Sequence, residues 1–237
     1  MKTLEHWLQE QARHGRHLYL ILDTDGQLDE RNALVSELGV DQCRNLYTGT
    51  PADSLANSGP YLFRLGSAEH PAVLALFDTP ERNWGWLASA ASDALDALSD
   101  HWQNRLVTGA RPNQALYRFH DNRVLARALA HLRCEQYPEY LGSMASVCYW
   151  QAQQWAVADN PAPGNYPLPA APAWLDIPTP EATCANVLFD NSRRYLMREH
   201  ADTLLEIACL AGTLTRRTKR RSNWRWRRYR PRITSVR

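Results

Sequence analysis

The sequence has no apolar run long enough to cross a bilayer, which takes about 20 consecutive apolar residues. The most apolar stretch, residues 204–210, is interrupted by Glu206. The first residues carry Glu5 and Glu10 and lack the apolar segment of a secretory signal. We therefore expect a protein without a membrane span that stays in the cytoplasm.

The sequence also lacks the motifs that mark common catalytic sites. It contains no G-x-x-x-x-G-K-[ST] phosphate loop, no G-x-G-x-x-G turn, no G-x-S-x-G elbow and no H-E-x-x-H pair. Two histidine–aspartate neighbours remain, Asp100-His101 and His120-Asp121. Side chains adjacent in sequence point apart on a strand or helix, so both pairs favour a structural role. We expect a protein that is not an enzyme, with no catalytic residues and no cofactor.

Metal centres and disulfide frameworks are not indicated either. The five cysteines contain no C-x-x-C pair and are scattered over the chain: Cys43, Cys134, Cys148, Cys184 and Cys209. Spacing of this kind predicts neither a zinc site nor paired sulfurs. We expect reduced cysteines that serve as packing residues and no bound metal.

Acidic residues are absent from the last part of the chain. Residues 216–237 hold eleven basic residues, so the remaining chain has a net charge of −9 although the whole sums to +2. We expect this tail to dock on an acidic surface, its own or a partner's, through Trp224, Arg225, Trp226, Arg227, Arg228 and Tyr229. Arginines interleaved with aromatics also suit nucleic acid or an anionic membrane, which is the alternative function.

Alternating strand and helix patterns run through the first two thirds of the chain. Apolar or β-branched runs predict strands at 17–22, 61–65, 84–89 and 115–119. Helical spacing predicts helices at 4–14, 29–38, 71–77, 92–106 and 122–132. Thr3 and Asp121 stand where N-caps belong. The pattern predicts an α/β (α+β) N-terminal lobe.

A change of composition divides the chain after this lobe. Seven of the fourteen prolines fall between residues 161 and 180, which is typical of a semi-rigid linker. The predicted domains are an α/β lobe at 1–158, a proline-rich linker at 159–180, a smaller all-helical C-terminal lobe at 181–215 and a basic tail at 216–237.

An ordered series of segments resembles a known family. The segments are 17–23 (HLYLILD), 46–51 (LYTGTP), 59–65 (GPYLFRL), 84–89 (WGWLAS), 116–125 (LYRFHDNRVL) and 140–142 (YLG). Together they resemble the adaptor-chaperones encoded between the VgrG spike gene and the effector gene of type VI secretion systems. The resemblance implies binding of the N-terminal region of a cognate secreted effector and its loading onto a VgrG-type spike protein.

Two groups of side chains are candidates for contact with an effector. Arg118 and Arg123 bracket the turn before the helix at 122–132 and either brace this turn or reach a partner. Nine tryptophans are many for 237 residues, and tryptophan is a preferred interface residue. Trp150, Trp155 and Trp174 flank or lie in the linker, where they either contact the effector or seal the lobes together.

Overall fold

The computed structural model describes residues 3–109 and 114–177 of the chain. The chain divides into two units, Met1–Ile177 and Pro178–Arg237, and the described residues all belong to the first. Their centre is a six-stranded sheet in the order β2-β3-β1-β4-β7-β8, with every pairing antiparallel. Its strands are β1 (His17–Leu22), β2 (Cys43–Asn45), β3 (Tyr61–Leu65), β4 (Gly85–Ala90), β7 (Met144–Gln151) and β8 (Gln154–Asp159).

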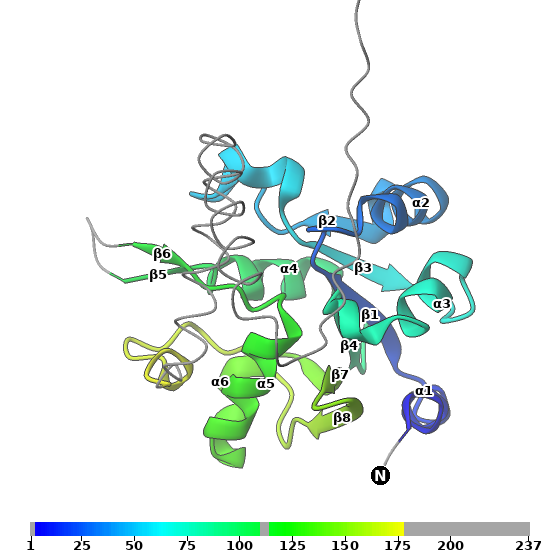
Figure 1. Cartoon of the computed structure of the whole chain (residues 1–237). Coiled ribbons are helices and arrows are strands. Elements are labelled where there is room, and N and C mark those ends of the chain that lie inside the picture. The colour runs from blue at the N-terminus through cyan, green and yellow to red at the C-terminus, as the bar shows by residue number, and fades with distance from the viewer. Residues whose placement is uncertain (1–2, 110–113, 178–237) are drawn as a thin grey trace, which may run out of the picture. The chain divides into compact units, whose positions relative to one another are not determined.

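Helices cover both faces of this sheet (Figure 1). One face carries α1 (Leu4–Arg13), α2 (Leu28–Leu38) and α3 (Pro71–Phe77). The other carries α4 (Leu95–Gln103), α5 (Asn122–His131) and α6 (Tyr137–Leu141). We call these the α1–α3 face and the α4–α6 face. A strand covered on both sides needs apolar residues at successive positions, which explains the unbroken apolar run of β1.

The α4–α6 face holds the larger core, and aromatic rings dominate it. Trp102 of α4 is fully buried and stacks on Phe119 with ring centres 4.6 Å apart. Trp86 of β4 and Tyr140 of α6 meet Trp102 edge to face, at 5.4 and 5.5 Å. The indole N–H of Trp86 donates to the Phe119 carbonyl over 2.9 Å. The segment before α5 is thereby fixed to the middle of the sheet.

The α1–α3 face packs a smaller cluster around two tryptophans. Trp7 of α1 is buried, and its indole N–H donates to the Ser146 hydroxyl of β7 over 2.9 Å. Trp84 is buried just before β4, and its indole N–H donates to the Leu76 carbonyl at the end of α3 over 2.7 Å. Both indole N–H groups are satisfied, as buried tryptophan requires. These two bonds tie α1 and α3 to the sheet.

The predicted α/β (α+β) lobe is confirmed as a mixed α+β fold, and its sheet is antiparallel. Strands β1 and β3 begin and end where the sequence predicts, and β4 is shifted by one residue. Thr3 and Asp121 cap α1 and α5 as predicted. The expected strand at 115–119 is wrong: only β6 (Ala115–Leu116) forms, paired with β5 (Val107–Thr108) in a separate ribbon. The chain then turns inward, and Phe119 joins the core.

Residues 160–177 of the proline-rich segment pack on the body of the fold. Arg105 donates to the Tyr166 carbonyl over 3.2 Å, and Gly164 N–H donates to the Gly142 carbonyl over 3.0 Å. Trp174, in the short 3-10 helix Ala173–Leu175, is buried in the α4–α6 core. The predicted all-helical lobe at 181–215 and the basic tail at 216–237 lie outside the described residues. Within the described ranges, no helix has the length and apolar character to cross a membrane.

Candidate partner-binding surface

The neighbouring strands β1, β4, β7 and β8 each have one terminus at the same end of the sheet. The last residue of β1, Leu22, pairs with Gly85 at the start of β4, and Trp150 near the end of β7 pairs with Trp155 near the start of β8. A Cβ at Gly85 would collide with the Ile21 carbonyl, so only glycine permits this close approach of β4 to β1. The segments at these strand ends therefore lie side by side as a strip along one end of the sheet.

The aromatic half of this strip is built on a fixed floor. Trp155 is half-buried and meets Trp150 of the partner strand with ring centres 5.5 Å apart at 72°. Its ring centre also lies 6.1 Å from that of Trp84 and 6.2 Å from that of Phe77. Because Trp84 is anchored to Leu76, the ring of Trp155 is held in place while part of it stays exposed.

A tight hairpin turn joins β7 to β8 beside this aromatic group. Its two central residues, Ala152 and Gln153, have φ of 48° and 63°. Two successive left-handed residues are the geometry of a type I′ turn, which matches the twist of the two strands. The turn sets the register in which Trp150 and Trp155 lie opposite each other.

The start of α5 is bonded to this end of β7. The side-chain amide of Asn122 donates to the Trp150 carbonyl over 2.7 Å. Asp121 caps the helix by accepting from the Arg123 N–H at 2.9 Å and also receives the Arg123 guanidinium at 2.9 and 2.7 Å. Burial opposes ionisation of the Asp121 carboxyl, but these bonds to Arg123 outweigh it and lower the pKa. The Arg123 side chain keeps 65% of its surface exposed.

The polar half of the strip lies over Asp23, the buried residue directly after β1. Its carboxylate pairs with the half-exposed guanidinium of Arg118 at 3.0 Å. His120 lies beneath, with its Nε2 3.8 Å from the same carboxylate oxygen, too far for a hydrogen bond. Burial lowers the pKa of His120 to about 4, so the ring is neutral at physiological pH. His120 and Asp121 thus have different neighbours, as their adjacency in sequence predicts.

The structure brings four of the five predicted contact residues to this one strip and places the fifth elsewhere. We call the strip the hairpin-end surface and define it by Asp23, Phe77, Arg118, Arg123, Trp150 and Trp155. Trp174 lies on the α4–α6 face, 5.2 Å from the ring of Tyr140 and 5.5 Å from the guanidinium carbon of Arg105. It is only 3% exposed and seals the proline-rich segment against the core.

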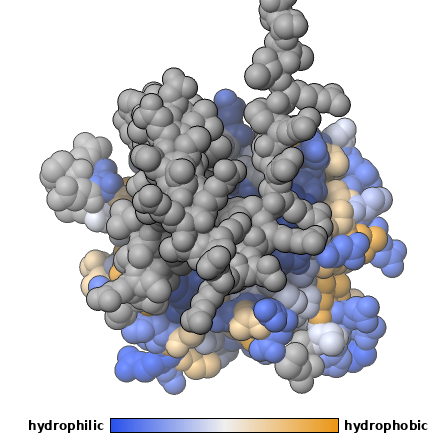
Figure 2. Space-filling model, in the orientation of Figure 1, coloured by the Kyte–Doolittle hydropathy of each residue, from blue (hydrophilic) through white to orange (hydrophobic). Residues whose placement is uncertain are grey.

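Phe77 and Asp23 belong to this surface, and neither is among the contact residues predicted from the sequence. Phe77 is the last residue of α3, and its position in the sequence does not distinguish it from other helix residues. Its contact with Trp155 of β8 depends on the tertiary fold. Leu74 of α3 is 45% exposed. Figure 2 shows hydrophobic residues among hydrophilic ones at the right of the view, the side on which α3 lies in Figure 1. An acidic residue directly after a buried strand was the available signal for Asp23.

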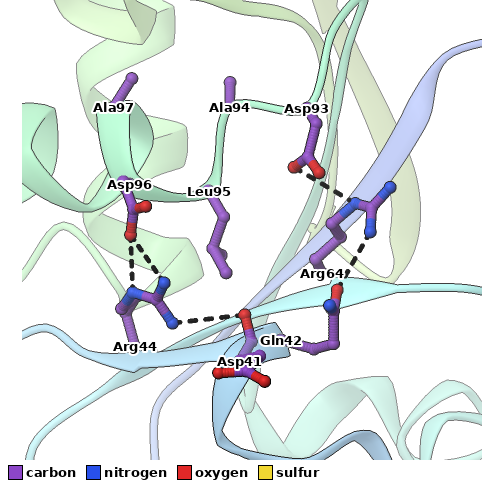
Figure 3. Close-up of a pocket in the computed structure, with 9 residues that line it drawn as sticks. All are labelled: Asp41, Gln42, Arg44, Arg64, Asp93, Ala94, Leu95, Asp96 and Ala97. Carbon is purple, nitrogen blue, oxygen red and sulfur yellow. Dashed lines mark hydrogen bonds and ion pairs between the residues drawn. The ribbon is translucent and has the colours of Figure 1, made fainter.

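A hollow of about 370 Å³ lies away from this surface, between β2, β3 and the start of α4 (Figure 3). Two arginines line it, and each is paired with an aspartate. Arg44 meets Asp96 at 2.7 Å, and Arg64 meets Asp93 at 3.3 Å. This internal pairing leaves the hollow without a surplus of positive charge. Among the described residues, no cluster of three or more His, Cys, Asp or Glu side chains is placed to hold a metal ion.

Comparison with known families identifies the class of protein. Residues 18–139, slightly more than half of the chain, match the model of a domain of unknown function, DUF4123. The chain therefore belongs to this family, which is associated with type VI secretion effectors. Neither a curated protein nor a solved structure matches the chain. The matched segment includes Asp23, Arg118 and Arg123, whereas β7 and β8 with Trp150 and Trp155 follow it.

Proposed function

We propose that this protein is an adaptor that binds the N-terminal region of a cognate type VI secretion effector and loads it onto a VgrG-type spike protein. The observation that carries the proposal is membership of a family associated with such effectors. The sequence resemblance supports the finer statement, because it points to adaptors encoded between a spike gene and an effector gene.

The hairpin-end surface supports a role in protein binding. Trp150 and Trp155 are half-buried rings on a rigid floor, which keeps the entropy lost on binding small. Tryptophan and arginine are the residues that most often dominate the energy of protein interfaces. Arg118 and Arg123 flank these rings and keep 47% and 65% of their side-chain surface exposed. The strip therefore has apolar anchors beside polar groups that can align a partner.

We also propose that the protein works by binding and not by catalysis. Its acidic groups at this surface already hold structural bonds: Asp121 caps α5 and binds Arg123, and Asp23 binds Arg118. A general acid or base needs to exchange a proton with a substrate, and groups committed to a helix cap or an ion pair are poorly suited to it.

The proposal is tested by co-expressing the full chain with the effector encoded beside its gene. The two proteins are then separated by size-exclusion chromatography at micromolar concentration. We expect one co-eluting complex that persists at high salt, because aromatic anchors are not screened. An effector from a different secretion cluster is the matched control. Two separate peaks for the cognate pair contradict the adaptor function.

A nucleic-acid or anionic-surface function is the second candidate, and it depends on the eleven basic residues of 216–237. Phosphate contacts release counterions, so such binding weakens steeply with salt. Retention on DNA or RNA that falls between 50 and 200 mM salt, about a thousandfold for six contacts, and vanishes on deletion of 216–237, supports it. Equal retention with and without the tail contradicts it.

A further inference from the structure

Strand β8 forms one edge of the sheet. The hairpin geometry decides which of its N–H and C=O groups face β7 and which face away. In a two-residue turn the flanking pair, Gln151 and Gln154, exchanges both hydrogen bonds. Every second residue of β8 then forms hydrogen bonds with β7. The hydrogen bond from the Asn160 N–H to the Ala145 carbonyl at 2.9 Å agrees with this alternation. The N–H and C=O groups of Trp155, Val157 and Asp159 consequently point away from the sheet.

These outward groups have no backbone partner among residues 3–109 and 114–177. After Asp159 the chain turns away from β8: Asn160 donates to the Gly142 and Met144 carbonyls at 2.9 and 2.8 Å. The outer side of β8 is therefore a row of three donors and three acceptors in the spacing that a neighbouring strand requires.

The opposite edge of the same sheet is protected. Strand β2 is only three residues long, and the guanidinium of Arg44 lies on the backbone beside it. One nitrogen of this group donates to the carbonyls of Val40, Asp41 and Cys43 at 3.2, 3.4 and 2.8 Å. Proteins usually block sheet edges with short strands, charges, prolines or bulges.

Strand β8 lacks most of these devices. It has six residues, contains neither proline nor lysine nor arginine, and pairs with β7 without a bulge. Its one charged residue, Asp159, ends the strand and accepts a hydrogen bond from the Ser146 hydroxyl at 2.7 Å. That carboxylate lies on the α1–α3 face together with Trp155 and Val157. The edge is thus open over Trp155 and Val157 and acidic at its end.

We propose that the β8 edge captures an extended segment of the effector, which adds a seventh strand to the sheet beside the hairpin-end surface. This inference rests on the proposed adaptor function and names the form in which the effector binds. Main-chain hydrogen bonds to Trp155, Val157 and Asp159 supply affinity, and side-chain contacts supply specificity.

The side chains of β8 define the chemistry of the captured segment. On the α1–α3 face the new strand lies about 4.8 Å from Trp155 and Val157, so its residues at alternate positions are apolar. Beside Asp159 a lysine or arginine satisfies the carboxylate. On the other face Ala156 and Ala158 are small and leave room for large side chains. The segment is therefore extended, alternately apolar and basic at one end.

A proline at Val157 tests the edge with little effect on the fold. The outward N–H of Val157 makes no bond within the described chain, so Val157→Pro removes a donor that only the partner uses. Val157→Thr is the matched control, because it keeps the shape and the N–H. With the effector's N-terminal region as probe, we expect Val157→Pro to weaken binding about tenfold or more and Val157→Thr less than about threefold.

Hydrogen exchange on the unaltered full chain gives a second test that needs no variant. We expect the amides of Trp155, Val157 and Asp159 to exchange rapidly in the free protein and slowly in the complex. Wild-type affinity in both variants, with no added protection at these amides, overturns the edge and leaves the adaptor function standing. Failure of the wild-type chain to bind the effector at all overturns both.

Two other occupants of the edge have distinct signatures, and either one overturns the proposal. If a second copy pairs through β8, the free protein is a dimer that Val157→Pro converts to a monomer while effector affinity stays unchanged. If residues 216–237 of the same chain occupy the edge, the three amides are protected in the free protein and lose that protection when the tail is deleted.

Discussion

The two faces of the central sheet use the same kind of residue for different purposes. On the α4–α6 face, Trp86, Trp102 and Trp174 are buried and bound to one another through Phe119 and Tyr140. On the α1–α3 face, Trp7 and Trp84 are buried, but Trp150 and Trp155 at the end of the hairpin, where Trp155 contacts Trp84, are half-buried. Tryptophan content alone therefore says little about binding, and the depth of each ring decides its role.

The largest effect on folding should come from the centre of the α4–α6 face. Trp102→Ala leaves a cavity against Trp86, Phe119 and Tyr140, and we expect it to lower the free energy of unfolding by about 3–5 kcal/mol. Trp102→Phe is the control and should cost about 1–3 kcal/mol, because it keeps the stack on Phe119. Urea denaturation measures both. A loss below 1 kcal/mol for Trp102→Ala contradicts the assignment of this ring to the core.

Acid should weaken the α4–α6 face through two buried histidines. Burial, with a smaller contribution from Arg105, lowers the pKa of His101 to about 4, and burial lowers that of His120 to about 4 as well. In the unfolded chain both protonate near 6.5, so between pH 6.5 and 4 the unfolded state binds more protons. We expect stability to fall by on the order of 1 kcal/mol per pH unit for each histidine.

Denaturation midpoints measured at each half pH unit test this window. His101→Gln and His120→Gln should each flatten the slope, whatever they do to stability at pH 7. Asp121 should not contribute there, because its carboxyl pKa lies below its ordinary value of 3.8 and its stabilisation is lost only under stronger acid. If the slope of stability against pH is unchanged in both variants, the conclusion that the two histidines are buried in their neutral form is contradicted.

The cap of α5 separates stability from binding at the hairpin-end surface. Asp121→Ala removes the cap and should cost about 0.5–2 kcal/mol, whereas Asp121→Asn keeps a capping side chain and should cost less. Arg123→Ala removes an ion pair in which the Asp121 side chain is buried but the arginine is 65% exposed; it should cost about 1 kcal/mol and mainly weaken effector binding. Calorimetric melting and effector titration give the two readouts. A contact role for Arg123 is contradicted if Arg123→Ala lowers the melting temperature substantially and leaves the effector affinity per folded molecule unchanged.

The smallest effect should come from relief of strain in the hairpin turn. Ala152 and Gln153 adopt left-handed φ of 48° and 63°, which cost energy in residues other than glycine and asparagine. Replacing the pair by Asn-Gly, the favoured type I′ sequence, should raise stability by about 1 kcal/mol. Thermal unfolding of the double variant checks this. A lower melting temperature indicates that the two native side chains make contacts that outweigh the strain.

Much of the fold could be predicted where local patterns and long-range packing agree. The apolar run of β1, the Asp121 cap and the helical spacing of α4 each predict their elements, although α4 (Leu95–Gln103) is shorter at both ends than the predicted helix at 92–106. The β7–β8 hairpin could not be predicted, because Ala152-Gln153 carries no turn signal and β7, buried on both faces over most of its length, shows no alternation. The strand expected at 115–119 failed because Phe119 packs into the core beside Trp102 and does not pair with a neighbour.

The sequence predicted which residues belong to the candidate site better than it predicted how they are arranged. Arg118, Arg123, Trp150 and Trp155 lie together, but they do so only because β4 and β7 are neighbours, a pairing between segments about 60 residues apart. Trp174 looked equivalent to Trp155 in sequence, since both flank or lie in the proline-rich region. Burial against Tyr140 and Arg105 separates them, and this contact depends on how the proline-rich segment folds back.

The comparison of Trp155→Ala with Trp174→Ala tests the central claim most directly. Effector affinity is measured by titration calorimetry and corrected for the folded fraction of each variant. We expect Trp155→Ala to weaken binding about tenfold or more with a modest loss of stability, because a half-buried ring serves the interface. Trp174→Ala should lower the melting temperature more and leave the corrected affinity unchanged. The reverse pattern, with binding dependent on Trp174 and indifferent to Trp155, contradicts the hairpin-end surface.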